Sequence, residues 1–179
     1  VDVVYAGLSG APYHVALEIQ ATSTTGTGIS YGPETNIGGA LNSTPELACS
    51  GYRILEMIGR GTDNKLYHNR YVPSEMAVGT FDGRTVSTGW QGWTTLNGNF
   101  YGSTTLSGER MEEFAAMSTR AGQLEVVSRV RPTPIFDDST QQYIFHNHYD
   151  ASRFGRYLWK TVHWRGYQKL STQRFLGRP

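Results

Sequence analysis

The sequence predicts an all-β protein that contains three copies of one four-stranded antiparallel unit. Of its 179 residues, 21 are glycine and 12% are aromatic, whereas only 17% are charged. This balance is typical of short strands joined by tight turns. The second observation is internal repetition, because one order of hairpin, loop and aromatic strand occurs three times. A repeat of this length sets the architecture of a whole fold.

The hairpin is clearest at residues 55–68, which read Leu-Glu-Met-Ile-Gly-Arg-Gly-Thr-Asp-Asn-Lys-Leu-Tyr-His. Residues 1–14 match it without a gap. Residues 124–129 match its first six positions, and the pattern resumes at residues 145–146 after an insertion at 131–141. An aromatic strand follows each hairpin. Its copies are residues 90–96 (Trp-Gln-Gly-Trp-Thr-Thr-Leu), residues 164–170 and, more weakly, residues 31–37.

The first unit has hairpin strands at residues 1–7 and 12–19 around a turn at 8–11. Small polar residues predict a mobile loop at 20–28, before an outer strand at about 29–37.

The second unit begins with a strand of small residues, and Asp63 and Asn64 tolerate the left-handed backbone of a tight turn. Its predicted elements are an inner strand at 46–50, strands at 52–60 and 66–72 around the turn 62–65, and a polar loop at 73–88 with its own turn at Asp82 and Gly83.

The third unit opens at residues 113–118, which match the inner strand 46–50 in position and size. Helix propensity is high over residues 111–117, but their place in the repeat favours a strand, and we predict a strand.

A four-stranded antiparallel sheet buries neither face alone, whereas sheets stacked around an axis bury both. The sequence therefore predicts a β-propeller of four-stranded antiparallel blades, with blades at approximately 1–43, 44–110 and 111–179 of a single domain. Known propellers have about four to eight blades. We expect another chain or a further segment to complete the ring, since the inner strand that should precede Val1 is missing. A β-sandwich of about eleven strands is the alternative, but it does not explain the repetition.

Composition also argues against several classes of partner and site. The net charge of +1 and the lack of a basic run argue against nucleic acid as a partner. Cys49 is the only cysteine, which excludes an intrachain disulfide and a cysteine zinc site. No apolar stretch is long enough to span a membrane. No cofactor is expected.

The middle unit resembles a known family. Residues 60–68 and 89–96 are similar to the repeat of propeller lectins of the Photorhabdus lectin type, which are related in blade pattern to tectonins and fucose-binding propeller lectins. The third copy lacks the Thr-Asp turn, and the first has Tyr31 where the middle copy has Trp90. The resemblance implies a non-enzymatic, secreted or extracellular lectin. Its partners would be fucose-type, galactose-type or methylated glycans, bound in clefts between blades.

Aromatic and polar residues at repeat-equivalent positions are the candidate sugar contacts, because a pyranose has an apolar face and hydroxyls that need partners. We prefer Trp90 and Trp164 as platforms. The spacing of three from Trp90 to Trp93 predicts that these rings face opposite sides of the sheet. The full candidate set is Trp90, Trp164, Trp93, Tyr167, Tyr31, His68, Arg70, His146, His148, Arg60 and Arg129.

Structural roles compete for the same residues. The rings can be core, and the histidines can be hydrogen-bonded between blades. The matching positions of Glu56 with Arg60, and of Glu125 with Arg129, predict ion pairs between blades. Asp63 reads as a turn residue.

No set of residues indicates catalysis. A glycosidase needs two carboxylates at a set separation, and the acids here lie in turns and repeat-equivalent strand positions. No nucleophile-elbow pattern is present. His146 and His148 have no evident third metal ligand. The alternative function is a propeller scaffold or protein-interaction domain of a larger secreted protein.

Overall fold

The computed structural model describes residues 1–22, 26–51, 53–63, 65–74, 79–81, 84–86, 88–96, 110–120, 123–131, 143–154, 158–164 and 168–170. These residues form antiparallel β-sheets and no helix, which confirms the all-β prediction. Within these ranges, there is consequently no helix that could cross a membrane.

The first sheet, sheet I, is centred on its longest strand. It comprises β1 (Asp2–Ala6), β2 (Pro12–Thr22), β3 (Gly26–Tyr31) and β4 (Thr35–Asn36). β1 pairs with one edge of β2, and β3 and β4 together pair with the other edge. Residues 20–22 and 26–28, which we predicted to be loop, are strand because the ladder continues to the pair Thr22–Gly26.

The second sheet, sheet II, follows the predicted order. Its strands are β5 (Glu46–Gly51), β6 (Ile54–Arg60), β7 (Leu66–Val72), β10 (Gly89–Trp90) and β11 (Thr94–Thr95), and the last two pair with the same edge of β7. Part of the predicted loop 73–88 is a small separate hairpin of β8 (Gly79–Phe81) and β9 (Arg84–Val86). The expected turn at residues 82–83 between them lies outside the described residues.

The third sheet, sheet III, repeats this order. Its strands are β12 (Arg110–Arg120), β13 (Gln123–Arg131), β14 (Tyr143–Phe154), β15 (Leu158–Trp164) and β16 (Gln168–Lys169). β12 confirms that the repeat, and not helix propensity, predicts the structure of residues 113–118. Residues 132–142, which form most of the insertion, lie outside the described part of the chain.

All three outer strands pair with the same one-residue offset, which in sheets I and II is a β-bulge. In sheet II, Trp90 pairs with Tyr71 and Thr94 with His68, so the outer strand has one residue more than β7 between the two pairs. The equivalent pairs are Tyr31–Leu17 and Thr35–His14 in sheet I, and Trp164–Tyr149 and Gln168–His146 in sheet III. The threefold repetition therefore extends to the register of the backbone.

The bulge corrects the predicted direction of two rings. Gly92 lies in it with a φ of 96°, and its N–H donates to Asn69 Oδ1 at 3.0 Å. The extra residue shifts the alternation by one, so Trp90 and Trp93 lie on the same face of sheet II, towards sheet I. The prediction that they face opposite sides was wrong, because a spacing of three gives opposite faces only in a regular strand.

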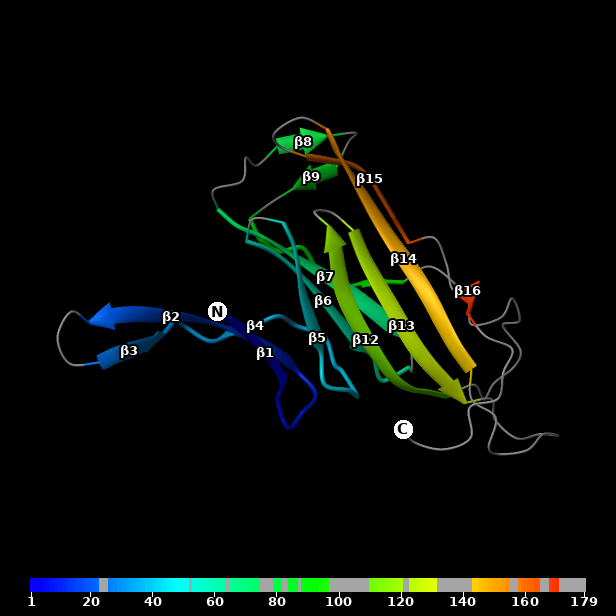
Figure 1. Ribbon diagram of the computed structural model, residues 1–179, viewed down its shortest axis with the longest axis horizontal. Coiled ribbons are helices and arrows are strands. Elements are labelled where there is room, and N and C mark those ends of the chain that lie inside the picture. Colours follow the sequence, from blue (N-terminus) through cyan, green and yellow to red (C-terminus); the bar gives the residue numbers. More distant parts are fainter. Residues whose placement is uncertain are drawn as a thin grey trace.

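The sheets lie side by side in chain order, with sheet II between sheets I and III (Figure 1). The inner strands β5 and β12 run alongside each other. The main core lies between sheets II and III. Its buried members are Ala48, Ile58, Leu66 and Leu96 from sheet II, and Leu124, Val126, Tyr149 and Trp164 from sheet III. The described sheets do not close into a ring.

Candidate functional site

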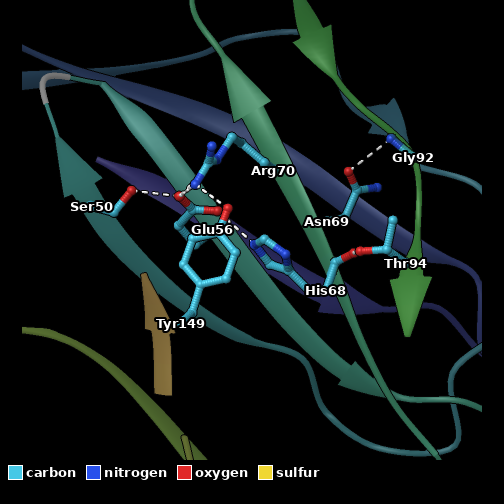
Figure 2. A network of polar contacts seen from close by, with 8 residues as sticks. All are labelled: Ser50, Glu56, His68, Asn69, Arg70, Gly92, Thr94 and Tyr149. Atoms are coloured by element: carbon cyan, nitrogen blue, oxygen red, sulfur yellow. Dashed lines mark hydrogen bonds and ion pairs between the residues drawn. The ribbon is translucent and has the colours of Figure 1, made fainter. Parts of the chain in front are cut away.

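Glu56 is the centre of a buried polar cluster between sheets II and III (Figure 2). One carboxylate oxygen lies 2.6 Å from Nε2 of His68. The other accepts hydrogen bonds from Nε of Arg70 at 2.8 Å and from the hydroxyl of Ser50 at 2.5 Å. Arg70 also donates to the hydroxyl of Tyr149, on sheet III, at 2.5 Å. The cluster thus links two sheets through charged hydrogen bonds.

Glu56 and Arg70 are both charged at neutral pH. Burial by itself would raise the pKa of Glu56, but the charge of Arg70 and the hydrogen bond with His68 outweigh it and lower this pKa to about 2. Burial would lower the pKa of Arg70, yet the charge of Glu56 keeps it raised. Burial raises the pKa of the Tyr149 hydroxyl, which therefore stays protonated. Glu56, Arg70 and Tyr149 therefore each keep one protonation state near neutral pH, and they join the two sheets.

The depressed pKa predicts acid sensitivity. A carboxyl group whose folded-state pKa lies below its ordinary value of 4.5 stabilises the fold above that value and loses this contribution as the pH falls towards about 2. We expect Glu56 to contribute about 3 kcal/mol at neutral pH by this linkage. Urea unfolding of the wild type and of Glu56→Gln at several pH values measures it. The difference in unfolding free energy should shrink as the pH falls, and a difference independent of pH would contradict the assignment.

Sheets I and III contain the same acid–histidine pair. Nε2 of His14 lies 2.9 Å from Asp2, and Glu125 binds His146 and, at 2.7 Å, Nδ1 of His148. Repeat-equivalent residues thus make equivalent contacts on all three sheets.

Glu56 and Glu125 do not make the predicted ion pairs between blades. The ion-pair partners that the structure gives them are His68 and Arg70 for Glu56, and His146 and His148 for Glu125, and these lie on the neighbouring strand of the same sheet. Arg60 instead donates to Asn42 Oδ1 at 2.7 Å, which fixes the connection between sheets I and II.

A tyrosine–tryptophan pair packs against two of these histidines. The ring of His14 lies 5.8 Å from that of Tyr71 and 5.4 Å from that of Trp90. At the next junction, His68 lies 5.0 Å from Tyr149 and 5.5 Å from Trp164. Trp164 is 8% exposed, and Trp90 is half-buried. Both preferred platforms therefore lie in packing junctions between sheets.

Trp93, another aromatic candidate, lines a pocket between sheet II and the connection that leads to it from sheet I. The pocket has a volume of about 350 Å³. It is formed by the connection from β4 to β5, the turn from β6 to β7, β7 itself and the bulge of the outer strand. Its lining residues are Gly39, Ala40, Leu41, Gly61, Thr62, Asp63, Tyr67 and Trp93.

The backbone of the connection fixes the Trp93 ring. Nε1 of Trp93 donates to the carbonyl oxygen of Gly38 at 2.7 Å. Gly39 has a φ of 86°, and a Cβ at this position would lie 2.9 Å from Nε1 of Trp93. A larger residue would therefore be strained and would displace the ring.

Asp63 and Tyr67 form the polar side of the pocket. Asp63 accepts hydrogen bonds from the hydroxyl of Tyr67 at 2.9 Å and from the N–H of Lys65 at 3.1 Å. Burial opposes ionisation of Asp63, but these hydrogen bonds and the Lys65 charge outweigh it and lower its pKa. The hydrogen bond to Asp63 raises the pKa of Tyr67. The pocket thus combines an indole ring, a carboxylate and a phenol.

Sequence reasoning assigned Asp63 to a turn and did not select Tyr67 or Gly39. The signal for Asp63 was the Thr-Asp pair of the repeat that resembles propeller lectins. Tyr67 recurs as Tyr13 in the first copy, but repetition alone does not separate a core tyrosine from a pocket tyrosine.

The other candidates lie elsewhere. Tyr31 is 73% exposed on the outward face of sheet I. His146, His148 and Arg129 are half-buried on the outward face of sheet III. Tyr167 lies outside the described residues. Among the side chains that the structure describes, no group of histidine, cysteine and acidic residues is arranged to bind a metal ion.

Comparison of the chain with models of known protein families gives no match. Comparison with curated proteins gives none either. The functional interpretation therefore depends on the geometry of the pocket and on the repeat.

Proposed function

We propose that this protein is a non-enzymatic carbohydrate-binding protein, a lectin, and that it binds sugar in the pocket around Trp93. The observation that carries the proposal is the convergence of Trp93, Asp63 and Tyr67 on one pocket, which sheet II forms with the connection from sheet I. An indole ring covers the apolar face of a pyranose. Carboxylate and phenol oxygens pair with its hydroxyls.

The chemistry of the pocket favours a neutral sugar. Asp63 is ionised at neutral pH, so it accepts hydrogen bonds from hydroxyls and repels acidic sugars. It is the only carboxylate among the described lining residues. Because most glycosidases use two carboxylates, this supports binding without hydrolysis.

The shared register of the three sheets supports a propeller as the complete fold. Sheets that stack about a common axis present equivalent clefts between neighbours, and several weak sites then act together. The resemblance of residues 60–68 and 89–96 to propeller lectins agrees with this proposal.

The test is binding of the purified chain to a glycan array, followed by calorimetry with the best neutral monosaccharide. Trp93→Ala is expected to weaken binding by at least about tenfold, since it removes the stacking surface. Asp63→Asn should also weaken binding, because a charged acceptor is replaced by a neutral one.

The matched control is Trp90→Phe, which changes a tryptophan on the same strand outside the pocket. It should leave the sugar affinity within about twofold, because its ring packs against His14 and does not line the pocket. Loss of binding in Trp90→Phe but not in Trp93→Ala would place the site at the packing junction and refute the pocket.

A second candidate function is a scaffold or protein-interaction domain of a larger secreted protein. It is favoured by the large apolar residues exposed on sheet I, among them Ile29 and Tyr31. An array without signal for any sugar would favour this candidate over the lectin.

A further inference from the structure

Each junction between neighbouring sheets joins the same two kinds of surface. An acid–histidine pair on one sheet meets a tyrosine–tryptophan pair on the next. The pairs are Asp2 and His14 with Tyr71 and Trp90 at the first junction, and Glu56 and His68 with Tyr149 and Trp164 at the second. Sheet II therefore has one kind of surface on each face.

The outward face of sheet III has an acid–histidine set that no described strand covers. The side chains of Glu125 and His146 are 20% and 28% exposed. The equivalent Glu56 and His68 at the closed junction are 0% and 4% exposed. On the same face as Glu125, Met117 is 59% exposed. This surface has the composition of one half of a junction.

The outward face of sheet I has the other half. Leu17 and Tyr31 pair with each other at the positions that Tyr71 and Trp90 occupy in sheet II. Tyr31 is 73% exposed, and on the same face Ile29 is 53% and Val3 39% exposed. Such neighbouring large apolar residues are uncommon on the surface of a soluble monomer and indicate an interaction surface.

We propose that the outward face of sheet III binds the outward face of sheet I in a second copy of this chain. Sheet II separates these two faces within one chain, so they cannot meet each other. A second copy presents the matching aromatic surface, in continuity with the two junctions already formed. Two head-to-tail junctions of this kind join two copies in a closed ring of six large sheets, within the range of about four to eight blades of known propellers.

The test is the mass in solution, measured by light scattering and sedimentation. The wild-type chain is expected at twice 19.9 kDa. Tyr31→Lys and Met117→Lys each place a charge in the junction, one from either face, and each should give the single-copy mass. Both positions are exposed, so the fold of one copy should persist, as far-UV circular dichroism can verify. The control is Leu8→Lys in the turn after β1. Leu8 is fully exposed and belongs to neither of the two faces, so the mass of this variant should equal that of the wild type.

Mixing distinguishes this junction from a symmetric one. The two variants together retain one unaltered sheet I face and one unaltered sheet III face, so the mixture should regain the two-copy mass that neither variant has alone. A wild-type chain that remains a single copy at its highest soluble concentration overturns the proposal. So does a result in which only one of the two variants dissociates, because a symmetric interface uses one face only.

Discussion

Replacement of Glu56 by glutamine is expected to lower the free energy of unfolding by about 3–5 kcal/mol, which is the usual cost of removing one partner from a buried ion pair. Glu56 is fully buried, and Arg70 is 8% exposed. The carboxylate balances the Arg70 charge and accepts hydrogen bonds from Arg70 and Ser50. Glutamine keeps the shape but not the charge, so the buried guanidinium loses its counter-charge. Guanidinium chloride unfolding monitored by tryptophan fluorescence measures the effect.

The repeat offers a matched control at Glu125, which binds His146 and His148 in the same way. In a single copy its side chain is 20% exposed, so water replaces part of the lost interaction when both replacements are made in the Tyr31→Lys chain, which does not form the proposed junction. Glu125→Gln is expected to cost less than about 1.5 kcal/mol. If Glu56→Gln and Glu125→Gln lose equal free energy of unfolding, burial does not determine how strongly the acid at this position stabilises the fold.

Replacement of Trp164 by alanine is expected to cost about 3–5 kcal/mol, because it leaves a cavity in the core between sheets II and III. Trp164 is 8% exposed and lies 4.9 Å from the ring of Tyr149 and 5.5 Å from that of His68. The loss should appear as a lower midpoint in thermal and chemical unfolding. Trp164→Phe retains a ring in the same space and should lose less than half as much.

This variant also tests the sequence-based preference for Trp164 as a sugar platform. A platform exposed to ligand could be truncated at little cost in stability. If Trp164→Ala unfolds like the wild type but loses sugar binding, the ring is a ligand contact and its burial in the junction is not the native arrangement.

The order of the strands could be predicted because each copy of the sequence pattern forms strands that pair in the same order. The repeat outweighed helix propensity at β12, since tertiary pairing decides between two local states of similar energy. It also placed His68 and His146 at equivalent positions. The partners of Glu56 were not predicted, because they depend on which residue lies opposite across the ladder and not on distance along the chain.

The pocket could not be predicted for a different reason. It depends on the approach of Gly38 and Gly39, in a connection, to Trp93, in a bulge. The sequence shows a glycine pair and a Gly-Trp pair, but the extra residue at Gly92 is visible only in the pairing of the two strands. The same unseen residue reversed the expected direction of the ring.

The bulge has an evolutionary consequence. Because its one-residue offset is built into the ladder of every sheet, the third residue after the first aromatic position can be exchanged without disturbing strand alignment. In this chain the residue at that position is Glu34 in the first copy, Trp93 in the second and Tyr167 in the third. In the first two copies, an acidic and an indole side chain thus stand at the same position of one scaffold, so a single replacement there changes the chemistry of the side chain presented beside the bulge.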